Sequence, residues 1–173
     1  MDRRQATDEE SRTEKESVEV YVRSMVTGDI PSVIRIERRC FPTPWSAKIF
    51  RTEIEDNAYA DYIVALIGDE MVGYAGQWLY SYEAHVTNIA VTPARRGRHI
   101  GARLLLSLMQ RAQLRGINRM TLEVRASNSK AMTFYRCYGF ELRGVRHNYY
   151  TDTHEDAMVM ACPDVAGVLE RRY

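Results

Sequence analysis

A strand, a short loop rich in arginine and glycine, and an amphipathic helix follow one another between Asn88 and Met109. An apolar segment ends at Val91, and apolar residues recur at helical spacing after His99. A loop that turns from a strand into a helix directs unpaired backbone N–H groups, and the positive end of the helix dipole, toward one point. The stretch therefore predicts a binding site for a phosphate group.

The charges around this loop are basic. No acidic residue occurs between Glu83 and Glu123. The arginines in the same interval are Arg95, Arg96, Arg98, Arg103, Arg111, Arg115 and Arg119. Two interpretations stay open at this point: a site for a multiply anionic ligand, or a solvated helix face. The net charge of the whole chain is +1, which indicates no general affinity for nucleic acid or membranes.

Two common phosphate-binding patterns are absent from the loop. It lacks the Gly-Lys-Ser/Thr ending of the Walker A pattern and the three glycines of the dinucleotide fingerprint. The loop resembles the pyrophosphate loop of the GCN5-related N-acetyltransferases, the GNAT superfamily, whose pattern is Gln/Arg-x-x-Gly-x-Gly/Ala. Arg96 and Gly101 match this pattern, and His99 stands where the first glycine is usual. The backbone at His99 must therefore adopt the loop geometry with a side chain attached.

Length and composition predict one globular domain. The chain has 173 residues, of which 45% are hydrophobic, and this is enough for a single sizeable core. We expect a disordered charged tail over residues 1–17, a catalytic domain over 18–162 and a C-terminal tail over 163–173.

The cysteines indicate the compartment. Cys40, Cys137 and Cys162 are odd in number and widely separated, which favours a reducing cytoplasm over a disulfide framework and indicates no metal site. No apolar run approaches the roughly 18 residues that a membrane span requires. We expect a cytoplasmic monomer that binds neither a membrane nor, directly, nucleic acid.

The hydrophobic pattern predicts an α/β fold with a mixed sheet of about seven strands and four helices, in the order β-α-α-β-β-β-α-β-α-β-β. Ser46 and Asn128 are expected to cap helices, and Gly139 to end one. Strands are expected near residues 18–23, 62–67, 71–79, 83–91, 120–125, 140–146 and 157–161, and helices near 29–40, 46–54, 99–115 and 128–138.

Longer motifs on both sides of the loop resemble one GNAT family, the bacterial ribosomal-protein alanine N-acetyltransferases or RimI family. The motifs are Phe41-x-x-Pro44-Trp45-Ser46, Asn88-Ile89-Ala90-Val91, Leu122 to Asn128, Phe134-Tyr135, Tyr138-Gly139-Phe140 and Asn148-Tyr149-Tyr150. The similarity runs from about Val18 to Ala161. It implies the GNAT fold and the use of acetyl-CoA.

Two residues are candidates for the chemistry. Acetyl transfer to a protein N-terminus must remove a proton from an amine whose reference pKa is about 8, so a carboxylate is a sufficient base. Glu123 is our candidate; the alternative is an exposed glutamate on the polar side of a strand. The resemblance assigns Tyr135 as the acid that protonates the coenzyme A thiolate, although Tyr135 and Tyr138 both suit a core. We expect direct attack, because no Cys or Ser lies in a recognisable nucleophile–base pattern.

The resemblance also implies where acetyl-CoA binds. The backbone of Ile89, Ala90 and Val91 would bond the pantetheine amides like an added strand. Asn128 would contact the cofactor further along, and no metal is expected. The residues that would surround the pyrophosphate are Arg96, Gly97, Arg98, His99, Ile100, Gly101 and Ala102.

The acceptor is expected between the Phe41–Ser46 turn and a loop at Asn148–Tyr150. The candidate substrate-binding residues are Phe41, Pro44, Trp45, Tyr149 and Tyr150, with Glu83 and His85 near the amine. Alternatively, the aromatic residues of the turn serve packing, and His85 is a surface histidine.

The resemblance implies a protein N-terminus as acceptor, namely the alanine of a small-subunit ribosomal protein. Two alternatives stay open. The acceptor is a lysine side chain or a small amine, or the chain is a non-catalytic module that senses acyl-CoA or docks on the ribosome.

Overall fold

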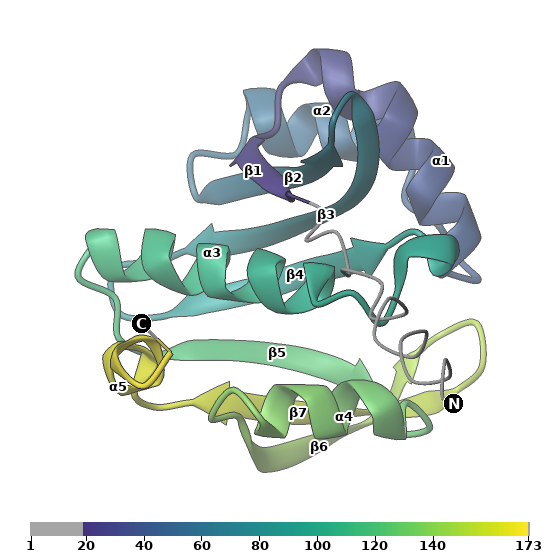
Figure 1. Ribbon diagram of the computed structural model, residues 1–173. Coiled ribbons are helices and arrows are strands. Elements are labelled where there is room, and N and C mark those ends of the chain that lie inside the picture. Colours follow the sequence, from purple (N-terminus) through teal and green to yellow (C-terminus); the bar gives the residue numbers. More distant parts are fainter. Residues whose placement is uncertain (1–18, 173) are drawn as a thin grey trace, which may run out of the picture.

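The computed structural model describes residues 19–172, so the expected tail over residues 1–17 lies outside the described residues. Seven strands form one sheet in the order β1-β2-β3-β4-β5-β7-β6 (Figure 1). The strands are β1 (Tyr21–Ser24), β2 (Ala60–Ile67), β3 (Glu70–Leu79), β4 (Ala84–Val91), β5 (Met120–Arg125), β6 (Glu141–Tyr150) and β7 (Glu155–Cys162). The helices are α1 (Ile30–Cys40), α2 (Ala47–Glu55), α3 (Ile100–Leu114), α4 (Ser129–Arg136) and α5 (Val165–Glu170).

The sheet is antiparallel except between β4 and β5, which run parallel. Their pairing is short, because it joins only Ala84 to Met120 and His85 to Thr121. Beyond these pairs the two strands diverge toward their C-terminal ends (Figure 1). The sheet is thus opened near its middle.

Helices cover both faces of the sheet (Figure 1). Helix α3 packs on one face, where Leu104, Leu105, Leu108 and Met109 are fully buried. Helices α1 and α2 cover the other face of the first strands, where Phe50 is fully buried. Each such apolar side chain stabilises the fold by about 1.5–3 kcal/mol. The two layers fix the position of β4 between them.

The expected fold class and element order are confirmed. Local signals placed the helix starts correctly. The Ser46 side chain accepts a hydrogen bond from the Ile49 N–H at 3.4 Å, and the Asn128 side chain accepts one from the Ala131 N–H at 3.1 Å.

A fifth helix occupies the segment that we expected to be a C-terminal tail. Helix α5 spans Val165–Glu170, and the Asp164 side chain accepts from the Gly167 N–H at its start. Val165 and Val168 are buried against the same core as α3. Two apolar residues three positions apart are too few to predict an amphipathic helix, because their burial depends on contacts with distant residues.

The expected loop at Asn148–Tyr150 is the end of strand β6. The pairing of β6 with β7 shifts register between Arg146 and Tyr150, and Asn148 has a φ of 51°. The Asn148 N–H donates to the Asp156 carboxylate at 2.9 Å. An irregular strand of this kind redirects side chains locally, which the alternation of the sequence does not reveal.

Helix α5 generates a prediction about Gly139. This glycine has a φ of 79°, and an added Cβ would lie 2.8 Å from Val168 Cγ2. Gly139→Ala should therefore lower the free energy of unfolding by at least about 1–2 kcal/mol. Gly144→Ala is the matched control, because nothing lies within 4 Å of its added Cβ. Urea unfolding measures both, and equal stabilities of the two variants would contradict the packing described.

Candidate active site

A cavity of about 490 Å³ lies between the α1–α2 turn, the diverging strands β4 and β5, helix α4 and the end of β6. The residues predicted from the sequence that line it are Phe41, Trp45, Ile89, Glu123, Asn128, Tyr135, Tyr149 and Tyr150. The structure therefore brings the candidate base, the candidate acid and both expected acceptor walls to one space.

The other predicted residues lie outside this lining. Pro44 belongs to the turn without facing the cavity, and Glu83 and His85 lie behind Glu123 toward the start of β4. The loop residues follow β4, at the opposite end of that strand. Those beyond the lining are Ala90, Val91, Arg96, Gly97, Arg98, His99, Ile100, Gly101 and Ala102.

The divergence exposes strand edges toward the cavity. Beyond His85 and Thr121, no pairing joins β4 to β5 within residues 19–172. Backbone groups that lose a strand partner need another one, and an extended ligand with amide groups supplies it. Asn88 also lines the cavity, and its buried Oδ1 has no hydrogen-bond partner in the described part of the chain. This edge suits a ligand that both donates and accepts hydrogen bonds.

The loop between β4 and α3 has the backbone of an anion site. His99 has a φ of 59° and a ψ of 12°, in the left-handed region, and Gly97 has a φ of 75°. His99 thus holds a left-handed conformation, which glycine adopts without steric cost. Such angles turn successive N–H groups toward one point, next to the N-terminus of the 15-residue helix α3.

The arginines of this region have different roles. Arg96 Nε donates to the Val91 carbonyl at 3.1 Å, so this side chain ties the loop to the end of β4. Arg95 pairs with Glu70. None of the ion pairs within residues 19–172 involves Arg98 or Arg103. The latter two cations remain for an anionic ligand.

Glu123 is held by two basic side chains. Its Oε2 lies 2.9 Å from His85 Nε2, its Oε1 lies 3.1 Å from Arg146 Nε, and its side chain is 12% exposed. The hydrogen bond from His85 lowers the pKa of Glu123 below its ordinary value, with Arg146 acting in the same direction and burial opposing both. Glu123 is therefore a carboxylate at neutral pH, in a fixed orientation beside the cavity.

Tyr135 and Tyr150 are neutral phenols at the cavity wall. Burial is the main cause that raises the pKa of each to about 12. The Tyr135 ring packs between Phe134 and Phe140, with centroids 5.2 Å and 5.5 Å away. No hydrogen bond to the Tyr135 hydroxyl occurs among the described residues, so its proton is available to a ligand.

A polar bridge joins the two acceptor walls. Asp152, which follows β6, accepts from Thr43 Oγ1 at 2.9 Å and pairs with Arg125 at 2.8 Å. The Arg125 guanidinium lies 3.9 Å from the centre of the Tyr150 ring. The bridge connects the α1–α2 turn to the end of the sheet and sets the width of the cavity on this side.

A buried glutamate anchors the turn from below. Glu37 is 1% exposed, accepts from the Trp45 N–H at 2.9 Å and accepts from the Tyr74 hydroxyl. Burial raises the pKa of Glu37 and that of Tyr74. Glu37 also lines the cavity, so it fixes Trp45 in the acceptor wall.

Sequence reasoning missed several of these groups. Glu37 gave a signal, because it is acidic on the apolar side of its helix, beside Val33 and Ile36. Arg146 gave none, since it reaches Glu123 from a strand that is not its neighbour in the sheet. Thr43 and Asp152 are 109 positions apart and meet only in the folded chain.

Two absences were found in the part of the chain that the structure describes. Residues 19–172 contain no group of three or more His, Cys, Asp or Glu side chains arranged to hold a metal ion. They also contain no helix with the length and apolar composition for crossing a membrane.

The fold, the phosphate loop and the opened sheet edge define an acyl-CoA-dependent N-acetyltransferase. A family model described as the acetyltransferase (GNAT) family matches residues 30–140. The chain belongs to this family and, within it, to the RimI family whose motifs it resembles.

Named relatives support this placement. The ribosomal protein bS18-alanine N-acetyltransferase of Escherichia coli K12 is 36% identical over 144 residues, which covers 82% of this chain and 96% of the relative. The N-alpha-acetyltransferase RimI of Mycobacterium tuberculosis is 34% identical over 149 residues, covering 82% and 90%. The crystal structure of the Escherichia coli ribosomal-protein-S18-alanine N-acetyltransferase superposes with a TM-score of 0.78 at 34% identity, covering 84% of this chain and 94% of that one.

The loop geometry generates a prediction about Gly101. An added Cβ at Gly101 would lie 3.9 Å from its nearest neighbours, so the site has room for an alanine. Gly101→Glu should weaken coenzyme A binding at least about 100-fold, because a carboxylate would repel phosphate at the N-terminus of α3. Gly101→Ala is the matched control and should bind normally. Calorimetric titration measures the affinity of both variants for coenzyme A. An unchanged affinity of Gly101→Glu would contradict the assignment of this loop as the phosphate site.

The buried Glu37 generates a prediction about pH. Its raised pKa means that the folded protein holds this proton more tightly than the unfolded chain does. The resulting stability is fully present below the ordinary pKa of 4.5 and is lost as pH rises through the raised pKa. The free energy of unfolding of the wild type should thus fall relative to Glu37→Gln as the pH rises above 4.5.

Urea unfolding at several pH values measures this difference. Glu55→Gln, at an exposed position in α2, is the matched control and should track the wild type. A constant difference between wild type and Glu37→Gln over the whole range would show that Glu37 is not destabilised by burial.

Proposed function

We propose that this chain transfers acetyl from acetyl-CoA to the α-amine of a protein, and that the acceptor is the N-terminal alanine of a small-subunit ribosomal protein. One observation carries the proposal: Glu123 and Tyr135 line the same cavity as the aromatic acceptor walls and as Ile89 of β4, the strand that leads to the phosphate loop. The names of the relatives, which specify bS18-alanine, support the choice of acceptor.

Glu123 and Tyr135 divide the proton transfers between them. Glu123, ionised and aimed at the cavity, accepts the proton of the ammonium group, directly or through a water. The amine nitrogen then bonds to the acetyl carbon, and the bond from that carbon to sulfur breaks. Tyr135, whose pKa of about 12 keeps it protonated at neutral pH, donates its proton to the departing sulfur. A backbone N–H near the end of β4 stabilises the oxyanion.

The residues present fit acetyl-CoA. The open edge from Ile89 to Val91 and the unpartnered Asn88 Oδ1 supply hydrogen bonds for the pantetheine amides. The N–H groups of the loop from Arg96 to Ala102, with Arg98 and Arg103, supply positive potential for the pyrophosphate.

The acceptor walls suit the end of a polypeptide. Phe41 and Trp45 from the turn face Tyr149 and Tyr150 from β6, and these rings present apolar faces with polar tips. A small first side chain fits such a slot, and the backbone of the acceptor finds hydrogen-bond partners at the rim. In this assignment, Glu83 and His85 act from behind Glu123 and do not hold the amine itself.

Mass spectrometry of two peptides incubated with protein and acetyl-CoA tests the acceptor. One peptide has a free N-terminal alanine and no lysine; the other has a blocked N-terminus and one lysine. We expect acetylation of the free α-amine only. Modification of the lysine alone would assign a side-chain acetyltransferase. Binding of acetyl-CoA without modification of either peptide would indicate a small-amine acceptor or a sensor.

The assignment of the base generates a further prediction. Glu123→Gln keeps the shape of the side chain and removes its negative charge, so kcat should fall about 100-fold or more while coenzyme A affinity stays unchanged. Steady-state kinetics and calorimetry measure the two quantities. Loss of coenzyme A binding in this variant would instead make Glu123 a structural residue.

A further inference from the structure

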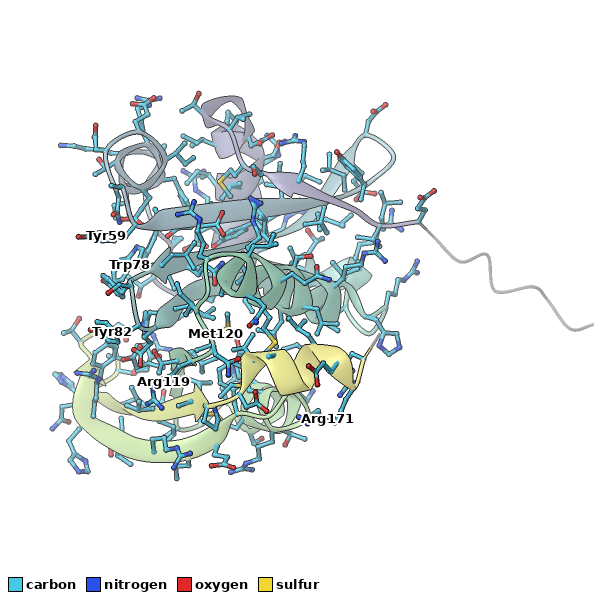
Figure 2. The ribbon with its side chains drawn as sticks, turned by 90° about the vertical axis from the view of Figure 1, so that its left-hand side faces the viewer. Tyr59, Trp78, Tyr82, Arg119, Met120 and Arg171 are labelled. Atoms are coloured by element: carbon cyan, nitrogen blue, oxygen red, sulfur yellow. The ribbon has the colours of Figure 1, made fainter. Side chains whose placement is uncertain are left out.

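A line of hydrogen-bonded side chains leads from Glu123 away from the cavity. His85 Nε2 lies 2.9 Å from Glu123, and His85 Nδ1 lies 3.0 Å from Thr121 Oγ1. Thr121 donates to Glu83 at 2.9 Å, and Glu83 pairs with Arg119 at 2.8 Å. Figure 2 looks onto the end of the sheet where this line reaches the surface, with Arg119 labelled. The phosphate loop follows the opposite end of β4.

The donors and acceptors along this line of side chains determine where each hydrogen atom lies. Both oxygens of Glu83 accept, one from Arg119 Nε and the other from the Thr121 hydroxyl. A threonine hydroxyl has one hydrogen to donate, so its oxygen must act as acceptor toward His85. His85 Nδ1 therefore carries a proton in every protonation state of the ring.

This tautomer has a consequence at the other ring nitrogen. A neutral imidazole with its proton on Nδ1 presents a lone pair at Nε2, and Glu123 Oε2 presents another at 2.9 Å. Two acceptors at hydrogen-bond distance repel each other unless one proton lies between them. When the ring carries a second proton, Nε2–H donates to Glu123, and this is the hydrogen bond that lowers the pKa of the carboxylate; when the ring is neutral, the Nε2 lone pair is free to take a proton from Glu123.

The surroundings add one further charge. Arg146, from β6, lies 3.1 Å from the other oxygen of Glu123. The neutral ring of Trp78, from β3, lies 5.9 Å from the His85 ring, measured between centroids. Tyr150, from the end of β6, is a neutral phenol near the same carboxylate. Arg146 and the hydrogen bond from His85 both lower the pKa of Glu123, so the carboxylate by itself is a weak base and the Nε2 lone pair of a neutral His85 is a second place for the proton.

We propose that His85 is a positioning residue that shares with Glu123 the proton taken from the acceptor amine, and that Thr121 and Glu83 fix its tautomer for this purpose. The inference rests on the proposed function of Glu123 as base. In the step, the N–H bond of the ammonium breaks, its proton moves to Glu123, and it is then shared with the free lone pair of His85 Nε2. The amine keeps the electron pair with which it attacks.

Thr121 offers a matched pair of variants. Thr121→Val preserves shape but removes the hydroxyl, so the neutral ring can place its proton on Nε2 and donate it to Glu123. His85 Nε2 then no longer presents a free lone pair to Glu123. Thr121→Ser keeps the hydroxyl and should behave as wild type. Thr121 does not line the cavity, so neither variant alters a group that faces substrate.

Nitrogen NMR of ¹⁵N-histidine-labelled protein reads the tautomer without any substrate. The chain has 4 histidines, and the signal lost in His85→Gln identifies the relevant one. At a pH where the ring is neutral, we expect the proton on Nδ1 in wild type and Thr121→Ser, and on Nε2 in Thr121→Val. A neutral wild-type ring with its proton on Nε2 would overturn the inference, whatever the activity of the protein.

Kinetics supply the second readout. Thr121→Val should lower kcat about tenfold and change the pH profile of kcat, with acetyl-CoA affinity unchanged. Thr121→Ser should stay within about twofold of wild type. Wild-type kinetics in Thr121→Val at every pH would overturn the shared-proton role. An inactive wild-type protein whose His85 still shows the expected tautomer would count against the proposed function and not against the hydrogen-bond line.

Discussion

Strands β4 and β5 are joined by two residue pairs and then separate, and the space in which the site lies depends on this divergence. If the strands had stayed paired, their backbone groups would have satisfied one another. Instead, β4 offers an open edge that ends at the phosphate loop, and β5 presents Glu123 toward the resulting space. Helix α3 packs against one side of β4 and α1 against the other, so β4 is held in place on both faces.

The parts of the fold that sequence reasoning predicted depend on local chemistry. Ser46 and Asn128 cap helices because their side chains reach an N–H three residues away, and Gly139 ends one because its backbone is left-handed. The departure at His99 was also predictable, since the loop pattern requires a φ that few residues adopt. Signals of this kind are complete within a few residues, so the order of strands and helices could be predicted.

The residues of the site could be predicted only where a sequence motif contained them. Glu123 and Tyr135 came from a resemblance, whereas the groups that set their chemistry came from the tertiary structure. Arg146 reaches Glu123 across the sheet, and the partner of Glu37 is Tyr74, on a strand 37 positions away. Helix α5 was missed for the same reason, because its burial depends on the core of a distant helix. No local pattern encodes these contacts, since they depend on register and packing.

The residue at position 99 determines at which stage the phosphate loop loses its conformational entropy, during folding or during ligand binding. With a glycine at this position, both the unfolded chain and the ligand-free loop would have many backbone conformations. A histidine has fewer backbone conformations than a glycine. Most of the entropy of this segment is therefore lost during folding, and less is lost when the ligand binds. The left-handed angle costs about 1–2 kcal/mol, which the rest of the domain offsets. The chain is thus slightly less stable to heat, and its phosphate loop is rigid before the ligand binds.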